Sequence, residues 1–143
     1  MCTFFVGDKM NKYMEIALKE AEKSLKTNDI PVGAVIVENN RIIAKSHNTR
    51  EKNHAITHHA EINAVEKAGK KKKTWHLSEC EIYITLEPCP MCMEVLKQAR
   101  IKTIYYGASQ LKQVNYKPIP KIKIENAEKA QQLLTDFFKN KRK

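Results

Sequence analysis

The segment Pro88-Cys89-Pro90-Met91-Cys92 and the segment His59-Ala60-Glu61, about thirty residues apart, constrain this chain more than any other part of its sequence. One imidazole and two thiols form a three-ligand set for Zn²⁺. Catalytic zinc sites keep three protein ligands and leave the fourth position to water, whereas structural sites use four. The pattern therefore predicts a catalytic zinc site with His59, Cys89 and Cys92 as ligands.

Glu61 follows the histidine ligand by two residues. A carboxylate is the wrong ligand type for a closed, sulfur-rich site, but it suits the movement of a proton to and from a zinc-bound water. Zinc makes such a water acidic near neutral pH and so generates hydroxide. Glu61 is thus expected to take the water proton and return it to a substrate ring nitrogen and then to the leaving amine. The arrangement H-x-E with P-C-x-x-C is the signature of zinc nucleobase deaminases.

A purely structural reading of the same residues stays open. A Cys-x-x-Cys pair is often half of a zinc knuckle, although this chain has no second Cys-x-x-Cys or His-x-His pair to complete a structural tetrahedron. Four cysteines could also form two disulfides, but the lack of an export signal and the distant histidine favour metal. Cys2 is then expected to be a free surface thiol, and Cys80 a small buried residue at the start of a strand. The alternative histidine ligands are His47, His54, His58 and His76, of which the adjacent His58 is interpreted as pointing elsewhere.

The chain length of 143 residues predicts a single domain. We expect residues 10–143 to form it and residues 1–9 to be a disordered extension. No apolar run approaches the roughly 20 residues that span a bilayer. The apolar patch at residues 2–6 is too short for a signal peptide core. The sequence therefore favours a cytoplasmic protein without membrane contact.

A formal net charge of +10 is substantial for this length and favours a polyanionic partner such as nucleic acid. Part of the charge is clustered, in a lysine run at residues 70–73 and in a basic tail at residues 139–143. The alternative is a lysine-rich surface that only keeps the protein in solution, and either run alone is more often solvated than a binding site.

Hydrophobic periodicity predicts helices and strands in alternation. Residues 11–28 have helical spacing, and the pattern ends at Asp29-Ile30-Pro31 because proline disfavours helix at the preceding residue. Residues 32–37 form a continuous apolar run that is typical of a buried strand. Asn39 and Asn40 tolerate positive φ and predict a tight hairpin into a second strand at residues 41–46.

The second half of the chain continues this alternation. A helix is expected over residues 58–68 with Gly69 as its C-terminal stop, and another from Pro90 to about residue 100. Strands are expected over residues 81–86, over residues 101–106 with Gly107 at the end, and briefly over residues 121–124. A last helix, capped by Asn126, has an apolar side that includes Phe137 and Phe138. The alternation predicts an α/β fold with one sheet covered by helices.

Several longer stretches resemble the bacterial tRNA adenosine deaminases of the cytidine deaminase superfamily. They cover nearly the whole chain from Met10 onward, in the order Asp29-Ile30-Pro31-Val32-Gly33-Ala34-Val35, Thr57-His58-His59-Ala60-Glu61-Ile62, Thr85-Leu86-Glu87-Pro88-Cys89-Pro90-Met91-Cys92, Tyr106-Gly107-Ala108 and Leu133-Leu134-Thr135-Asp136-Phe137-Phe138. The resemblance implies a three-layer α/β/α fold, a central mixed sheet with helices on both faces. It also implies a homodimer with one Zn²⁺ per subunit.

The activity implied by the resemblance is hydrolytic conversion of adenosine to inosine at the wobble position of tRNA. Asn48 is implied as a hydrogen-bond partner of the flipped purine. Lys112, Lys139 and Arg142 are implied as contacts to the RNA of the anticodon stem-loop, in keeping with the basic charge.

Three departures from the family pattern concern substrate contacts. Family members usually carry alanine at the position of His58, and aspartate at the position of Gln110, where Lys112 remains. The segment between Lys112 and the last helix is shorter than usual and lacks a glycine-rich turn. Because of Gln110, a contact to the nucleotide backbone next to the edited base is expected to differ in this chain.

Two alternative functions share parts of the pattern. A deaminase of free guanine or another small nucleobase has the same zinc motif, but it has no need of a cationic C-terminus. A non-catalytic, zinc-stabilised RNA-binding protein would need the ligands and the charge but not Glu61.

Overall fold

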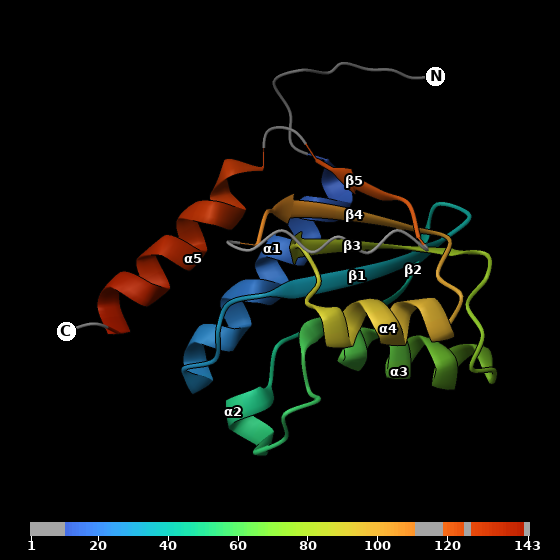
Figure 1. Ribbon diagram of the computed structural model, residues 1–143, viewed down its shortest axis with the longest axis horizontal. Coiled ribbons are helices and arrows are strands. Elements are labelled where there is room, and N and C mark those ends of the chain that lie inside the picture. Colours follow the sequence, from blue (N-terminus) through green and yellow to red (C-terminus); the bar gives the residue numbers. More distant parts are fainter. Residues whose placement is uncertain (1–10, 111–118, 125–126, 142–143) are drawn as a thin grey trace.

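The computed structural model of the chain describes residues 11–110, 119–124 and 127–141 (Figure 1). The expected extension at residues 1–9 lies outside the described residues, as do Lys112, Asn126 and Arg142.

A five-stranded mixed sheet forms the centre of the fold. In spatial order it contains β2 (Arg41–His47), β1 (Gly33–Glu38), β3 (Cys80–Leu86), β4 (Thr103–Ala108) and β5 (Lys121–Lys123). β1 is antiparallel to both of its neighbours, whereas β3, β4 and β5 run parallel. The parallel pairs need crossover connections, and α4 (Pro90–Gln98) supplies the one between β3 and β4.

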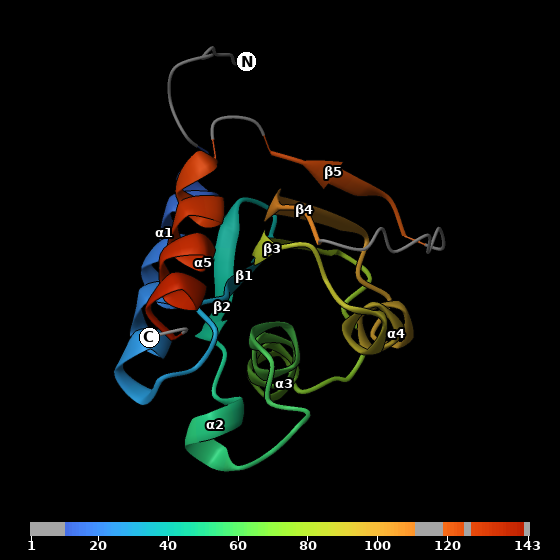
Figure 2. The same cartoon turned by 60° about the vertical axis from the view of Figure 1, so that its left-hand side comes forward.

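Helices cover both faces of this sheet (Figures 1 and 2). α3 (Ala60–Lys72) and α4 lie on one face, and α1 (Lys12–Lys23) and α5 (Glu128–Lys141) lie on the other. A one-turn helix, α2 (Arg50–Asn53), and a 3₁₀ turn, η1 (Ser24–Thr27), complete the described elements. The predicted α/β class and the three-layer arrangement are confirmed.

The apolar core fills the space on either side of the sheet. Ile36, Ile82 and Leu96 are completely buried between the sheet and the α3–α4 layer. On the other face Met14 of α1 packs in a second cluster with Val35 and Tyr83. Successive residues of β1 thus bury both faces, which explains why its sequence is continuously apolar rather than alternating.

Gly33 fixes how closely α1 approaches the sheet. A Cβ atom on this residue would lie 1.9 Å from the backbone oxygen of Ala17. No L side chain fits at that distance, so the start of β1 needs glycine for close helix–strand packing rather than for unusual backbone angles.

The predicted hairpin turn is present, and the first helix has a side-chain cap. The side chain of Asn11 caps α1 by accepting hydrogen bonds from the backbone nitrogens of Tyr13 and Met14. Asn39 and Asn40 have φ values of 50° and 63°, as a two-residue hairpin turn requires. Cys80 is fully buried as the first residue of β3, as expected.

Two glycines do not end the elements that they were expected to end. α3 continues through Gly69 to Lys72 and stops at Lys73, which has a φ of 58°. The alanines and lysines around Gly69 are strong helix formers and outweigh the single cost of about 1 kcal/mol for glycine in a helix. β4 likewise runs through Gly107, where an added Cβ would lie 3.0 Å from the Cβ of Ala130 in α5. This glycine lets a helix pack closely on the sheet.

Two side chains at apolar positions of the first and last predicted helices are exposed rather than buried. Leu25 is 43% exposed because the chain tightens from α1 into η1 at Ser24 and turns that side chain outward. Phe138 is 44% exposed, whereas its neighbour Phe137 is buried. α2 was not predicted. Within the described residues, no helix is both long and apolar enough to cross a membrane.

Candidate zinc and substrate site

The starts of α3 and α4 bring the predicted zinc ligands together. His59 is the N-cap residue of α3, and Cys89 is the N-cap residue of α4, with Pro90 at the first helical position. Cys92 lies in the first turn of α4 and is completely buried. Both helices begin at the same end of the sheet (Figure 1), so ligands that are thirty residues apart in sequence meet at one point.

The distances between the three ligand atoms fit a single zinc ion. The Nδ1 atom of His59 lies 3.8 Å from the Sγ atom of Cys89 and 3.4 Å from the Sγ atom of Cys92. Tetrahedral ligation with Zn–N near 2.0 Å and Zn–S near 2.3 Å separates nitrogen from sulfur by about 3.5 Å. Within the described part of the chain, these residues form the one group of three or more metal-binding side chains that meet in this way.

The pKa values of the two thiols are shifted in opposite directions because the thiols are hydrogen-bonded to each other. The bond from Cys92 lowers the pKa of the Cys89 thiol to about 4. The same bond, together with burial, raises the pKa of the Cys92 thiol. The hydrogen bond with Cys89 raises the pKa of the His59 imidazole. Metal ligation requires two thiolates and a neutral imidazole, so binding of a cation at this site releases protons.

Glu61 lies in the first turn of α3 and is 4% exposed. Burial raises the pKa of its carboxyl to about 7 in the metal-free chain. A divalent cation on the neighbouring ligands acts in the opposite direction, because its charge favours the carboxylate. Glu61 is thus a buried carboxyl two residues from the ligand His59. This is a suitable position for a group that carries protons to and from a reacting water.

A cavity of about 740 Å³ opens beside the ligand cluster. His59, Glu61 and Cys89 line it together with residues from β2's C-terminal end, from the end of β4 and from α5. Its volume lies in the range of small-molecule sites. The cavity can hold a nucleobase next to the ligand cluster.

Asn48 lines this cavity directly after the end of β2. Its side-chain nitrogen donates to the backbone oxygen of Ile30 at 3.1 Å, and its side-chain oxygen accepts from the backbone nitrogen of Arg50 at 3.1 Å. These bonds fix the orientation of the amide. They leave one N–H hydrogen and one oxygen lone pair for a substrate.

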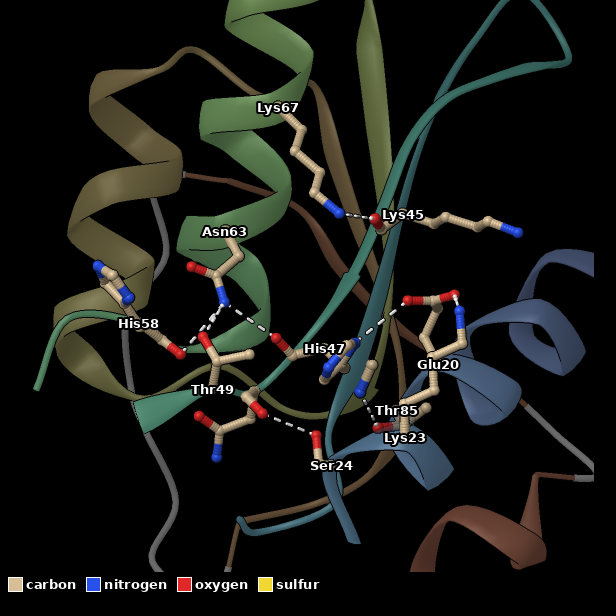
Figure 3. Close-up of polar contacts among 12 residues, drawn as sticks. Glu20, Lys23, Ser24, Lys45, His47, Thr49, His58, Asn63, Lys67 and Thr85 are labelled. Atoms are coloured by element: carbon tan, nitrogen blue, oxygen red, sulfur yellow. Dashed lines mark hydrogen bonds and ion pairs between the residues drawn. The ribbon is translucent and has the colours of Figure 1, made fainter. Parts of the chain in front are cut away.

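Asn63 of α3 was not singled out from the sequence, but it connects two parts of the site (Figure 3). Its side-chain nitrogen donates to the backbone oxygen of His47 at 2.9 Å, to the Oγ1 atom of Thr49 at 2.9 Å and to the backbone oxygen of His58 at 3.3 Å. The residue thereby joins the helix that carries His59 to the segment on either side of Asn48. In the sequence, the one sign of this role is that Asn63 lies one helical turn after the ligand His59.

Gln110 also lines the cavity, and its contacts are to Glu87. Its backbone nitrogen donates to the Oε1 atom of Glu87 at 3.1 Å, and its side-chain nitrogen donates to the backbone oxygen of Glu87 at 2.7 Å. Lys121 pairs with the other carboxylate oxygen of Glu87 at 2.6 Å. Gln110 therefore fastens the end of β4 to the segment that precedes the cysteine ligands.

Of the three predicted RNA contacts, the structure describes one. Lys139, near the C-terminal end of α5, lines the cavity. Lys112 and Arg142 lie outside the described residues. The four alternative histidines are not in the ligand cluster; His58, for example, contacts the side chain of Asn53 at 2.8 Å.

Comparison with known proteins agrees with this fold. Residues 8–142 match the MafB19-like deaminase family. A tRNA-specific adenosine deaminase of Rickettsia bellii is 49% identical over 102 residues, which cover 69% of this chain and 70% of that protein. One from Streptococcus pyogenes is 43% identical over 100 residues, or 70% of this chain.

Two solved structures share the architecture. One, from a study of A-to-I editing by tRNA:A34 deaminases at the wobble position, has a TM-score of 0.80 and 30% identity, covering 86% of this chain and 99% of that chain. A guanine deaminase from Bacillus subtilis has a TM-score of 0.66 and 28% identity, covering 92% of this chain and 95% of that chain.

The fold and the His-Cys-Cys cluster define a deaminase of the MafB19-like family. Within this class, the chain belongs to the family of tRNA-specific adenosine deaminases. The matched region spans 63% of the Streptococcus pyogenes relative and 58% of others from that species, so it corresponds to part of the length of those proteins.

Proposed function

We propose that the protein hydrolyses adenosine to inosine at the wobble position of a tRNA anticodon, with Glu61 as the proton shuttle and one Zn²⁺ on His59, Cys89 and Cys92. The observation that carries this proposal is the placement of a buried carboxylate and three zinc-type ligands on the wall of one cavity. The tRNA-specific adenosine deaminases among the relatives support the choice of substrate.

The reaction consumes one water and releases one ammonia. Zn²⁺, when bound, supplies the positive charge that makes water acidic near neutral pH. Glu61 accepts a proton from the attacking water, delivers one to the purine ring nitrogen next to the reacting carbon, and then protonates the departing amine. The burial of Glu61 keeps its proton away from bulk solvent during these transfers.

Asn48 is proposed to orient the purine in the cavity through its remaining amide hydrogen and oxygen lone pair. Because Ile30 and Arg50 already hold this amide, little side-chain freedom is lost when a base binds. Gln110, fastened to Glu87, is proposed to border the neighbouring nucleotide.

The RNA outside the cavity is proposed to contact Lys139, Lys112 and Arg142 through its phosphates. Lys139 lines the cavity from α5, and the net charge of +10 favours a polyanion. Because the proposed substrate is tRNA, we also propose a cytoplasmic enzyme. The homodimer implied by the family resemblance belongs to the same proposal.

Deamination of free guanine is the second candidate. It is favoured by the similarity to the guanine deaminase from Bacillus subtilis. Lys139 on the cavity wall distinguishes the two candidates, since a neutral free base gains nothing from a lysine placed to hold phosphate.

The test is incubation of purified, zinc-loaded protein with an anticodon stem-loop that carries adenosine at the wobble position. Inosine at that base, measured by nuclease digestion and mass spectrometry, is the expected result. A matched stem-loop with guanosine there, and free guanine, are the controls. Deamination of guanine without action on the adenosine stem-loop would overturn the proposal in favour of the second candidate.

A further inference from the structure

Trp75 is an exposed aromatic residue far from the cavity. It follows the C-terminal end of α3 and is 63% exposed, and it is the single tryptophan of the chain. A single exposed apolar side chain is ordinary on a protein surface, so the neighbours of this ring decide whether it has a role.

Two neighbouring side chains shape the surface around this ring. The guanidinium carbon of Arg100 lies 5.3 Å from the centre of the Trp75 ring, within the range of a cation–π contact. The His76 ring meets it edge-on, with the centroids 5.1 Å apart. Arg100 follows the C-terminal end of α4 and has a φ of 68°, so a turn of the backbone brings it to the tryptophan.

Several lysines are close in sequence to Trp75 and Arg100. Lys70, Lys71 and Lys73 precede Trp75 in sequence, and Lys102 follows Arg100. None of these four lysines forms an ion pair with another described residue, whereas Lys72 pairs with Glu38 at 2.6 Å. Lysines at a helix C-terminus are favourable on their own, so the charge alone would be an ordinary solvated surface. The exposed tryptophan among them is what sets this surface apart.

This surface lies at the opposite end of α3 from the ligand cluster. The helix begins next to His59 and has 13 residues, which corresponds to about 20 Å at 1.5 Å per residue. The C-terminal ends of α3 and α4 lie together at the end of the molecule away from α5 (Figure 1). A nucleotide that occupies the cavity cannot reach Trp75, so any contact here is a separate one.

We propose that Trp75, Arg100 and the flanking lysines form a second RNA-contact surface, on which an unpaired base stacks while the cations hold the adjoining phosphates. Stacking on an exposed aromatic ring next to basic side chains is how proteins bind single-stranded nucleic acid without reading its sequence. The inference rests on the proposed function, because a tRNA is long enough to occupy the cavity and this surface together. A second copy of the chain is a less suitable occupant, since the contact would bring two groups of lysines together.

The first experiment uses the intrinsic fluorescence of the only tryptophan in the wild-type protein. The titrant is a tRNA transcript with guanosine at the wobble position, which presents no adenosine there for the proposed deamination. Saturable quenching, with a midpoint that rises with salt concentration, is expected. Unchanged fluorescence under conditions where a filter-binding assay shows bound RNA would overturn the proposal. A fluorescence change that depends on protein concentration without RNA would assign the surface to a second copy instead.

Substitutions separate stacking from other effects. Trp75→Phe keeps an aromatic face and is expected to bind the transcript within about twofold of wild type, whereas Trp75→Ala is expected to bind roughly tenfold more weakly. Ile122→Ala, which changes another exposed apolar side chain at 46% exposure, is the matched control and is expected to bind as wild type does. Equal binding by all three variants would contradict the proposal.

Kinetics distinguish failure of this surface from failure of the proposed function. On a wobble-adenosine tRNA, Trp75→Ala is expected to raise KM and leave kcat and zinc content unchanged. Normal deamination with a normal KM would overturn only the second surface. Absence of wobble deamination in the wild-type protein would overturn the proposed function, while the fluorescence titration would still decide whether RNA binds at Trp75.

Discussion

The side-chain nitrogen of Asn63 lies 2.9 Å from the Oγ1 atom of Thr49 and donates a hydrogen bond to it. This contact joins the helix that presents His59 and Glu61 to the segment that presents Asn48. In a second contact, the hydroxyl of Ser24 donates to the backbone oxygen of Asn48 at 2.9 Å and holds the same segment. The position of Asn48 relative to His59 thus depends on Asn63 and Ser24, which are not themselves predicted to bind zinc or substrate.

Replacing Asn63 is expected to misplace Asn48 relative to the ligands. Asn63→Ala removes the donor shared by three acceptors, at a cost of roughly 1–3 kcal/mol in the free energy of unfolding. We expect kcat/KM to fall about tenfold, since small displacements of positioning groups are costly in catalysis, while zinc content stays at one per chain. Urea unfolding, metal analysis and kinetics measure the three quantities. Gln98→Ala, which removes an exposed amide that donates to Glu94, is the matched control. Wild-type kinetics in Asn63→Ala would show that the connection is dispensable.

Substitution of Glu61 tests the proton shuttle separately from the metal site. Glu61→Gln keeps the shape of the side chain, and Glu61→Ala removes it. Both variants are expected to retain the fold and one zinc, and to lose a factor of about 10²–10⁴ in kcat, the contribution of a positioned general acid–base. Metal analysis and single-turnover deamination are the measurements. Full activity would refute the assigned role, and loss of zinc and folding would indicate a structural part for this residue.

The fold was largely predictable because its signals are local. The apolar run of β1, the Asn39-Asn40 turn and the proline at the start of α4 each determine their structure within a few residues. Gly107 does not end β4 as predicted, because its effect depends on a packing partner, Ala130, which lies 23 residues further along the sequence, and no local pattern reveals that proximity. Gly69 does not end α3, because the strong helix formers around it outweigh the cost of one glycine.

The ligand cluster was predictable from residue type, and the residues that support it were not. His59, Cys89 and Cys92 have a spacing and chemistry that few other functions need. Asn63, by contrast, is an ordinary polar residue in a helix, and its importance arises only from where β2 ends. Gln110 departs from the family pattern, which the sequence shows. Its two hydrogen bonds to Glu87 could not be predicted, because the sequence does not reveal which segment lies opposite the end of β4.

Removal of zinc is expected to abolish activity and to lower thermal stability. Cys92→Ser weakens ligation, because the hydroxyl is a poor zinc ligand compared with a thiolate. Cys80→Ala is the matched control, since Cys80 is equally buried but lies outside the ligand cluster. We expect Cys80→Ala to keep one zinc per chain and wild-type kcat, with a loss of stability of about 1 kcal/mol. Chelation followed by titration with zinc measures how much activity and thermal stability return. Zinc retention by Cys92→Ser with full activity would contradict the assigned ligand set.

Glu20 is expected to make stability depend on acid pH. Burial acts to raise the pKa of this carboxyl, but the hydrogen bonds and charges of Lys23 and His47 outweigh it and hold the pKa below the ordinary value of 4.5. A carboxyl with a depressed folded-state pKa stabilises the fold at pH values above 4.5, and this contribution is lost as the pH falls through the folded-state value. The difference in unfolding free energy between wild type and Glu20→Gln should therefore be larger at pH 7 than near pH 3. Glu66→Gln, an exposed site in α3, is the control. An equal difference at both pH values would exclude the ionised carboxylate as its source.

Lys139 is expected to contribute to RNA binding through a phosphate contact that depends on its position at the cavity. It lines the cavity from the last turns of α5, whereas Lys129 lies exposed in the first turn of the same helix and does not line the cavity. Lys139→Gln should weaken binding of a wobble-adenosine stem-loop and reduce the slope of log K against log salt by about 1, because one phosphate contact is lost. Lys129→Gln removes the same charge from the chain and should leave that slope unchanged. Filter binding at several salt concentrations, with zinc content as a check on the site, measures both. If the two variants have the same slope, net charge rather than the position of Lys139 governs RNA binding.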